Sequence, residues 1–199
     1  MKHELTAKEG QDILDRDPKY QAMMAEKARR RADMEAMFDR DEKPLIEALT
    51  AAGWAEKVRQ CGDTRSVWDF VNTAEPYPHL LEILAEHVIR PYHFRTREGI
   101  ARALAVREAR GTRIPRVLMD ELKKLTDPKD ESQTSYRWAL INTLVTIGDS
   151  SMEEDVRQLL ADPRYATVRA DLQRMATATM KRTTSGGTKR PTRGGGKPR

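Results

Sequence analysis

Two nine-residue stretches that lie forty residues apart share one pattern. "TREGIARAL" (96–104) and "YRWALINTL" (136–144) each carry an arginine, an apolar residue three places later and a leucine seven places later. "VRADLQRMA" (168–176) repeats the pattern after a further 32 residues, with alanine in the last place. Such intervals are typical of two-helix repeats, in which each helix pair covers the hydrophobic face of the next. The spacing therefore predicts a stack of helix pairs.

Turn signals divide the chain after Pro78 into six segments that we expect to be helical. The breaks are "RPYH", "ARGTR", "DPKDES", "GDSS" and "ADPR". The predicted helices form three pairs and cover residues 78–90, 95–109, 114–126, 133–147, 153–162 and 165–180. The aligned positions of the second helices are Arg97, Arg137 and Arg169, then the predicted core residues Ile100, Leu140 and Leu172, then Leu104, Leu144 and Ala176.

The composition agrees with an all-α fold. Charged residues make up 34% of the chain and hydrophobic residues 38%, which suits helices that each bury one stripe. No segment shows the sustained alternation of a half-buried strand. A length of 199 residues fits one domain with appendages.

The N-terminal part contains helix signals that do not belong to the pairs. Asp17 and Pro18 predict the start of a long helix that runs to Lys43 and has a basic middle, Lys27 to Arg31. A short helix is expected at 43–53, and another of two to three turns at 64–73. The predicted organisation is a loose N-terminus (1–17), N-terminal helices (18–64), a repeat domain (65–180) and a tail (181–199).

The tail accounts for the basic character of the chain. Residues 181–199 hold seven Lys or Arg and no acid, whereas the remaining chain has 29 basic and 31 acidic residues. Gly, Ser, Thr and Pro without apolar side chains do not offset the entropy of ordering, so we expect this tail to be disordered.

The paired pattern resembles HEAT repeats, a family of armadillo-type α-solenoids. HEAT pairs carry an acidic loop residue and then "R-x-x-[apolar]-x-x-x-L" on the second helix. Residues 92–111, "YHFRTREGIARALAVREARG", are also similar to a segment of small bacterial HEAT-like proteins. The resemblance implies a right-handed α-solenoid of about three helix pairs, with extra N-terminal helices.

The resemblance also implies a structural ladder between repeats. In the family, a loop aspartate pairs with the arginine of the second helix and links neighbouring repeats. Asp130 with Arg137, and Asp162 with Arg169, fit this pattern. Arg97 fits without an acid of its own, because Arg90 stands in the corresponding place.

The second helices of HEAT arrays line the concave face, so their remaining surface is the candidate binding site. Trp and Arg dominate binding hot spots, because both bury a large area and also donate hydrogen bonds. An alternative is that Trp138 packs across the repeat boundary. Another is that the stripe grips a phosphate or a flipped base, as in HEAT-like DNA glycosylases, although no carboxylate lies beside Trp138 to assist such chemistry. The predicted partner-binding residues are Trp138, Arg102, Asn142, Arg174 and Glu98.

Catalytic and metal-binding motifs are missing from the sequence. It contains no G-x-x-x-x-G-K-[ST], G-x-G-x-x-G or G-x-S-x-G. His79, His87 and His93 are eight and six residues apart, which does not place two ligands on adjacent helical turns. Cys61 is the only cysteine, so we expect a structural or incidental role for it. We expect no enzyme activity, no metal and no cofactor.

The sequence therefore favours a protein-binding module or adaptor that acts through its concave face. No run of eighteen apolar residues or signal-peptide core is present, so the expected location is the cytoplasm, away from membranes. The oligomeric state stays open. The alternative is weak, nonspecific association with nucleic acid through the cations Arg29, Arg30 and Arg31 of the first helix and Lys189, Arg190 and Arg193 of the tail.

Overall fold

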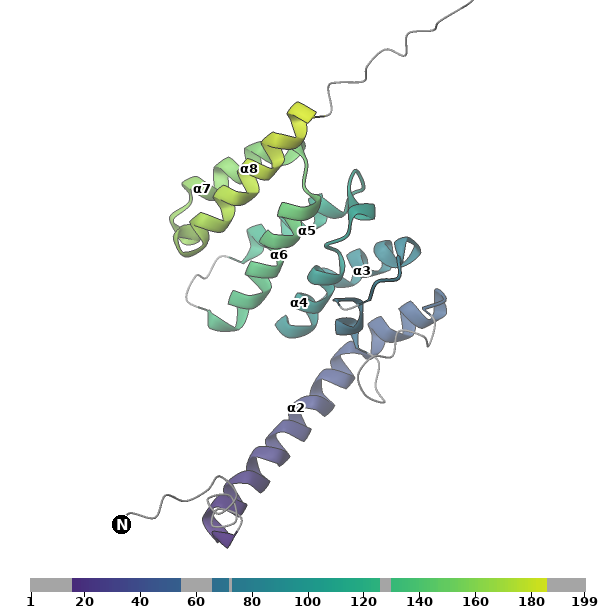
Figure 1. Cartoon of the computed structure of the whole chain (residues 1–199), viewed down its shortest axis with the longest axis vertical. Coiled ribbons are helices and arrows are strands. Elements are labelled where there is room, and N and C mark those ends of the chain that lie inside the picture. Colours follow the sequence, from purple (N-terminus) through teal and green to yellow (C-terminus); the bar gives the residue numbers. More distant parts are fainter. Residues whose placement is uncertain (1–15, 55–65, 72, 126–129, 186–199) are drawn as a thin grey trace, which may run out of the picture. The chain divides into compact units, whose positions relative to one another are not determined.

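The computed structural model describes residues 16–54, 66–71, 73–125 and 130–185, and all regular structure in these ranges is helical. They form seven α-helices, α2 to α8, joined by short 3-10 turns, and the described ranges contain no strand (Figure 1). This confirms the all-α prediction for the described part of the chain. The predictions for residues 1–15, for Cys61 and for the tail beyond Ser185 lie outside these ranges.

The first helix, α2 (Pro18–Ala51), is longer than expected. It begins as predicted, because the backbone N–H of Lys19 donates to Asp17 Oδ1 at 2.9 Å. The two predicted helices, 17–43 and 43–53, are however one helix with Pro44 inside it. Glu42, Leu45 and Leu49 are buried on both sides of Pro44. Their packing holds the helix together although proline removes one backbone hydrogen bond.

The chain divides into two compact units, Met1–Asp41 and Glu42–Arg199. The division falls inside α2, earlier than the boundary expected near residue 65. In the first unit, the part of α2 from Pro18 onward exposes most of its side chains, including Met23 and Met34. In the second unit, the buried Glu42 accepts hydrogen bonds from Ser66 Oγ and from the Val67 backbone N–H, at 2.9 and 3.1 Å. The second unit therefore includes the last turns of α2.

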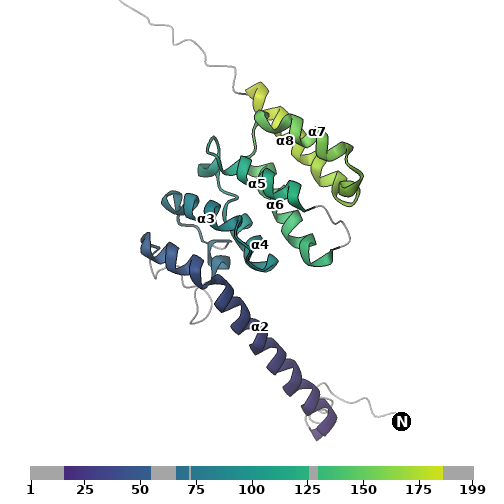
Figure 2. The same ribbon diagram turned by 180° about the vertical axis from the view of Figure 1, so that it is seen from behind.

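Six helices of the second unit form three consecutive pairs (Figure 2). The first pair is α3 (Leu81–Val88) with α4 (Phe94–Ala103), and the second is α5 (Ile114–Lys124) with α6 (Thr134–Ile147). The third is α7 (Glu153–Ala161) with α8 (Arg169–Ser185). The 3-10 turns are η2 (Val67–Val71), η3 (Pro78–Leu80), η4 (Arg107–Ala109), η5 (Glu131–Gln133), η6 (Ser150–Met152) and η7 (Pro163–Val168).

Six predicted helices correspond to α3–α8, and three predicted boundaries need correction. The helix expected at 95–109 ends at Ala103, and its last part is the separate turn η4. Within the helix expected at 64–73, the described residues 66–71 contain only the 3-10 turn η2. The last helix begins after η7 and continues to Ser185, so the first five residues of the predicted disordered tail are helical.

The pairs stack in chain order. Within each pair the two helices pack together, and across pairs α4 packs on α6 and α6 on α8. The second helices therefore lie side by side, as the repeat pattern predicts. The aligned apolar positions form the core of this stack: Ile100, Leu104, Leu140, Leu144 and Leu172 are fully buried, and Ala176 is half-buried.

Three hydroxyl groups connect the stack by donating to carbonyls in the last turns of helices. Carbonyls in the last turn of a helix lack the regular intrahelical donor that earlier carbonyls have. Tyr77 Oη donates to the Ala103 carbonyl at 2.7 Å, and Thr143 Oγ1 of α6 donates to the Ala101 carbonyl at 2.8 Å. Tyr165 Oη donates to the Leu122 carbonyl of α5 at 3.0 Å. Two of these bonds therefore join a later helix pair to an earlier one.

The ion pairs that connect one helix pair to the next involve acidic residues that are not part of the HEAT pattern. Arg97 of α4 forms an ion pair with the buried Glu121 of α5, and its Nε donates to the Val88 carbonyl at 3.0 Å. Asp155 of α7 accepts from Arg116 and Lys123 of α5. The acids that join the pairs thus lie on first helices, and Arg97 has a partner that the sequence pattern missed.

The implied ladder has a different outcome at its two sites. Arg137 is buried and donates to the Leu125 carbonyl at 3.5 Å, while Asp130 accepts from the side-chain amide of Gln133 at 2.5 Å. The ion pair of Asp130 with Arg137 stays a prediction.

The implied pair of Asp162 with Arg169 does not form, and Arg169 is exposed. Asp162 caps η7 instead: it accepts from the Arg164 backbone N–H at 2.9 Å and pairs with the Arg164 guanidinium. This pairing lowers the pKa of the Asp162 carboxyl. The negative charge of Asp162 is therefore paired with the guanidinium of Arg164, two residues further along the chain.

Candidate functional site

The structure brings the five predicted binding residues onto one surface of the second helices. Glu98 and Arg102 come from α4, Trp138 and Asn142 from α6, and Arg174 from α8. We call this set the second-helix face. Arg102 reaches across to α6, where its Cζ lies 4.9 Å from the centroid of the Trp138 ring. Arg174 reaches from the other side, with its Nη2 3.5 Å from Asn142 Oδ1.

Arg102 is fixed at the centre of this face. Its Nε and Nη2 donate to the same oxygen of Glu98, at 2.9 and 2.7 Å. Its Cζ also lies 5.7 Å from the ring of Trp68, which comes from η2. The guanidinium is therefore held by one carboxylate and two indole rings, an arrangement that the attraction of cations to aromatic faces stabilises.

Trp138 remains accessible to solvent despite this contact. Its side chain is 42% exposed, the exposure of a large ring that is supported on one side. Trp138 contacts Arg102 of the neighbouring helix pair and is still exposed, so the alternative that it packs across the repeat boundary stays open beside the binding role. Within α6, Asn142 Nδ2 donates to the Trp138 carbonyl at 2.9 Å, which orients the amide one turn away.

The second-helix face is balanced in charge. Arg102 is paired with Glu98, and Arg174 is paired with Asp171 three residues before it. Asn142 bridges from α6 by accepting from Arg174. Each arginine of the face thus has an acid within hydrogen-bond reach. Such a surface attracts polyanions weakly, because the cations are already neutralised.

Trp68, Asp171 and Gly99 belong to this site and were missed by sequence reasoning. The sequence signal for Asp171 was its spacing of three from Arg174, whereas Trp68 was visible only as part of an apolar patch. Gly99 brings α4 and η2 together. A Cβ at this position would lie 2.5 Å from Val67 Cγ1 and 3.1 Å from Trp68 Nε1. The glycine therefore allows the close approach that seats Trp68 beside Arg102.

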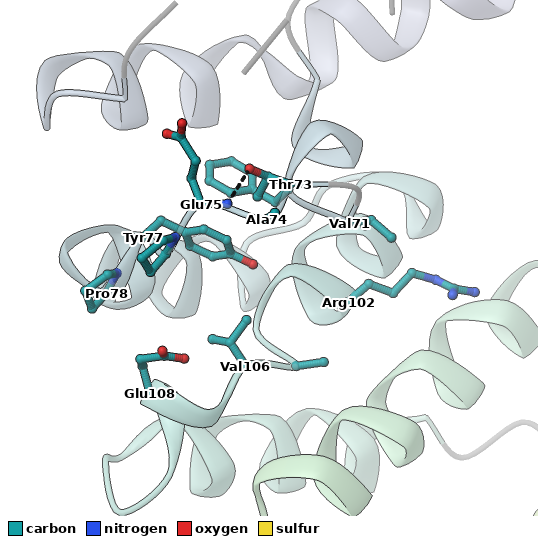
Figure 3. Close-up of a pocket in the computed structure, with 12 residues that line it drawn as sticks. Val71, Thr73, Ala74, Glu75, Tyr77, Pro78, Arg102, Val106 and Glu108 are labelled. Carbon is teal, nitrogen blue, oxygen red and sulfur yellow. Dashed lines mark hydrogen bonds between the residues drawn. The ribbon is translucent and has the colours of Figure 1, made fainter. Parts of the chain in front are cut away.

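A pocket of about 390 Å³ adjoins the face and shares Arg102 with it (Figure 3). Phe70 and Tyr77 contribute two aromatic rings, which meet edge to face with centroids 4.7 Å apart. Burial of Tyr77, with a smaller contribution from the Glu108 carboxylate, raises the pKa of Tyr77 to about 12. The other walls come from the segment after η2 and from the segment between α4 and η4.

The cations of the nucleic-acid alternative are only partly described. On α2, Arg30 pairs with Glu26 at 2.5 Å and Arg31 pairs with Glu35 at 2.8 Å, while Arg29 is exposed. The pairing with Glu35 raises the pKa of Arg31. The tail residues Lys189, Arg190 and Arg193 lie outside the described residues.

The three histidines in the described ranges form no metal-binding cluster. His79 and His93 are exposed, whereas His87 is buried and its Nδ1 lies 2.7 Å from the hydroxyl of Tyr92. Within the described ranges, no three potential metal-binding side chains come together. No helix in the described part of the chain combines the length and the apolar character needed to span a membrane.

Comparisons of the chain with protein-family models, with curated proteins and with solved structures found no match.

Proposed function

We propose that the protein is a non-enzymatic binding module that recognises another protein through the second-helix face. The observation that carries this proposal is Trp138, a large ring that is 42% exposed and is supported by Arg102. Hot spots at protein interfaces are enriched in Trp and Arg. Both side chains are held before a partner arrives, so binding loses less conformational entropy than it would with mobile side chains.

The arrangement of helices supports the choice of a binding module. We propose that the three pairs form a HEAT-like α-solenoid, because neighbouring second helices pack side by side and each pair contacts the next. A short solenoid presents a rigid surface made of successive second helices. The second-helix face would then be the recognition surface of this array.

A protein partner suits the face better than a nucleic acid does. Glu98 and Asp171 neutralise its two arginines, whereas binding of a phosphate backbone requires cations that are free to displace counterions. An exposed indole beside paired charges instead offers apolar area with hydrogen-bonding groups around it, as the centre of a protein interface does.

Affinity capture from extract of the source cells tests the proposal. The full-length protein, the Trp138→Ala variant and the Ile89→Ala variant serve as baits, and captured proteins are quantified by mass spectrometry. Ile89 is the matched control, because it is also a large apolar side chain and is 53% exposed. We expect Trp138→Ala to weaken capture of the partner by at least about tenfold, as hot-spot truncation does, and Ile89→Ala to leave it unchanged.

Nuclease treatment of the extract separates the two classes of partner. Capture that survives nuclease and depends on Trp138 supports the protein-binding function. Capture that is equal for Trp138→Ala and the unchanged protein contradicts it. Capture that disappears with nuclease supports the nucleic-acid alternative instead.

A further inference from the structure

The pocket beside the second-helix face carries negative charge that nothing in the described structure neutralises. Glu75 and Glu108 line it, and within the described residues neither carboxylate has a hydrogen bond or an ion pair. Among the described residues that line the pocket, the only cation is Arg102, whose guanidinium is bound to Glu98. In Figure 3 the Glu108 carboxylate turns toward the pocket, whereas the Arg102 guanidinium and the Glu75 carboxylate turn away from it.

The walls of the pocket suit a flat side chain. The half-buried ring of Tyr77, backed by the buried Phe70, forms one side, and Val71 and Val106 add aliphatic surface. The Tyr77 hydroxyl already donates to the Ala103 carbonyl, so the ring is fixed. A guanidinium stacks on aromatic rings and donates to a carboxylate from its edge. The volume of about 390 Å³ lies within the range of small-ligand pockets, about 300–1,000 Å³.

We propose that this pocket receives a cationic side chain of the partner protein, arginine in preference to lysine, with Glu108 as its charge partner. The inference rests on the proposed function, because it assigns the chemistry of a partner segment that lies on the second-helix face. Arg102 makes this continuity possible: its stem lines the pocket while its guanidinium contacts Trp138. A peptide over Trp138 therefore has a neighbouring side chain within reach of the pocket.

Other occupants fit less well. An acidic group would be repelled by the Glu108 carboxylate, which turns toward the pocket. A purely apolar group would take Glu108 out of water without a compensating interaction, which is costly for a carboxylate. A guanidinium compensates the carboxylate and at the same time covers the aromatic wall.

A titration followed by nuclear magnetic resonance tests the proposal. The isotope-labelled full-length protein is titrated with the peptide acetyl-Gly-Gly-Arg-Gly-Gly-amide, and matched peptides carry lysine or the uncharged isostere citrulline. We expect the arginine peptide to shift backbone signals of Ala105, Val106 and Glu108, the lysine peptide to bind more weakly, and the citrulline peptide not to bind. Glu108→Gln should weaken binding of the arginine peptide by at least about fivefold.

Glu131→Gln is the charge-matched control, because Glu131 is an exposed acid on η5 and does not line the pocket. It should bind the arginine peptide as the unchanged protein does. The proposal is overturned by equal binding of citrulline and arginine peptides, by an unchanged affinity in Glu108→Gln, by shifts confined to other acidic surfaces, or by no binding. These results are independent of Trp138-dependent capture. A failed titration with intact capture rejects the pocket alone, whereas failed capture with a successful titration rejects the proposed function of the face.

Discussion

At the scale of single residues, Gly99 determines how closely α4 approaches η2. A methyl group at this position would lie 2.5 Å from Val67 Cγ1, well inside van der Waals contact. Gly99→Ala should therefore destabilise the protein, because overpacking costs about 1–3 kcal/mol and alanine recovers at most about 1 kcal/mol through helix propensity. We expect a net loss in the free energy of unfolding, measured by urea denaturation.

The double variant of Gly99→Ala with Val67→Ala checks the cause of that loss. Removing the Val67 methyl groups makes room for the alanine, so the added cost of Gly99→Ala should be smaller in this background. An equal cost with and without Val67 would show that the contact does not limit the approach. The tryptophan fluorescence of the single variant should also change, because Trp68 and Trp138 both contact Arg102.

A second residue-scale effect concerns acid stability. Burial of His87, and then the nearby Arg90, lower the pKa of this imidazole, while Glu86 opposes the shift. Well above about pH 6.5 the histidine is neutral in both folded and unfolded chains. As the pH falls below that value, the unfolded chain binds a proton before the folded one does. The contribution of His87 therefore makes the folded state less stable as the pH falls from about 6.5 toward the folded pKa.

Urea denaturation at pH 7.5 and at pH 5.0 measures this effect. His87→Gln should lose less free energy of unfolding between the two pH values than the unchanged protein does, because glutamine does not titrate. An exposed histidine, His79, supplies the control, and His79→Gln should keep the full loss. The same loss in His87→Gln as in the control would assign the acid sensitivity to other groups.

At the scale of helices, the hydroxyl of Thr143 connects α6 to the end of α4. Thr143→Val keeps the shape of the side chain but removes the donor to the buried Ala101 carbonyl. We expect a loss of about 1–2 kcal/mol in the free energy of unfolding. Thr146 is the matched control on the same helix, because its hydroxyl bonds only to the Asn142 carbonyl one turn earlier. Similar effects of Thr143→Val and Thr146→Val would mean that the link between helix pairs contributes little.

The hydrogen bond between Thr143 and the Ala101 carbonyl shows why the presence of a helix was easier to predict than its end. The apolar spacing around Ile100 and Leu140 repeats along the sequence and indicates helices by itself. The end of α4 at Ala103 has no comparable local signal, since hydroxyls from Tyr77 and Thr143 occupy its last carbonyls. Those donors lie far away in the sequence. Pro44 is the opposite case, a strong local stop signal that tertiary packing overrides.

The sequence predicted those residues of the candidate site that lie at regular helical spacing on the second helices. Trp138 and Asn142 are one turn apart, and alignment of the repeats placed Arg102 and Arg174 beside them. Trp68 enters from a 3-10 turn with no repeat pattern, so only the tertiary structure places it against Arg102. The pocket depends on the irregular segment that contains Tyr77, which carries no periodic signal.

At the scale of the whole molecule, the excess charge lies outside the described helices. A chain that ends at Ser185 loses five basic residues and keeps 31 basic and 31 acidic ones, and it retains the whole second-helix face. We expect this shortened protein to lose weak binding to single-stranded nucleic acid at low salt. Binding by the full-length chain should weaken with salt, with a slope near −0.7 per phosphate contacted.

Partner binding through Trp138 should behave differently in the same comparison. It should survive the truncation and change little with salt, because burial of an aromatic ring is not screened by ions. Fluorescence anisotropy with a labelled oligonucleotide and capture of the protein partner measure the two activities. Loss of the protein partner on truncation would contradict the assignment of protein binding to the second-helix face. Tight nucleic-acid binding by the shortened chain would contradict the assignment of nucleic-acid binding to the tail.

The direction of the hydroxyl links has a consequence for how the chain folds while it is being synthesised. The donor residues Thr143 and Tyr165 are synthesised after their acceptors, the carbonyls of Ala101 and Leu122, which belong to earlier helix pairs. Before the following pair has been synthesised, such a carbonyl is exposed and can bind water. A hydroxyl donor already enclosed in the core without its acceptor would instead be a buried unsatisfied group. Synthesis of the earlier pair therefore leaves neither of these two polar groups buried and unpaired, and the following pair brings the donor to an acceptor that is already in place.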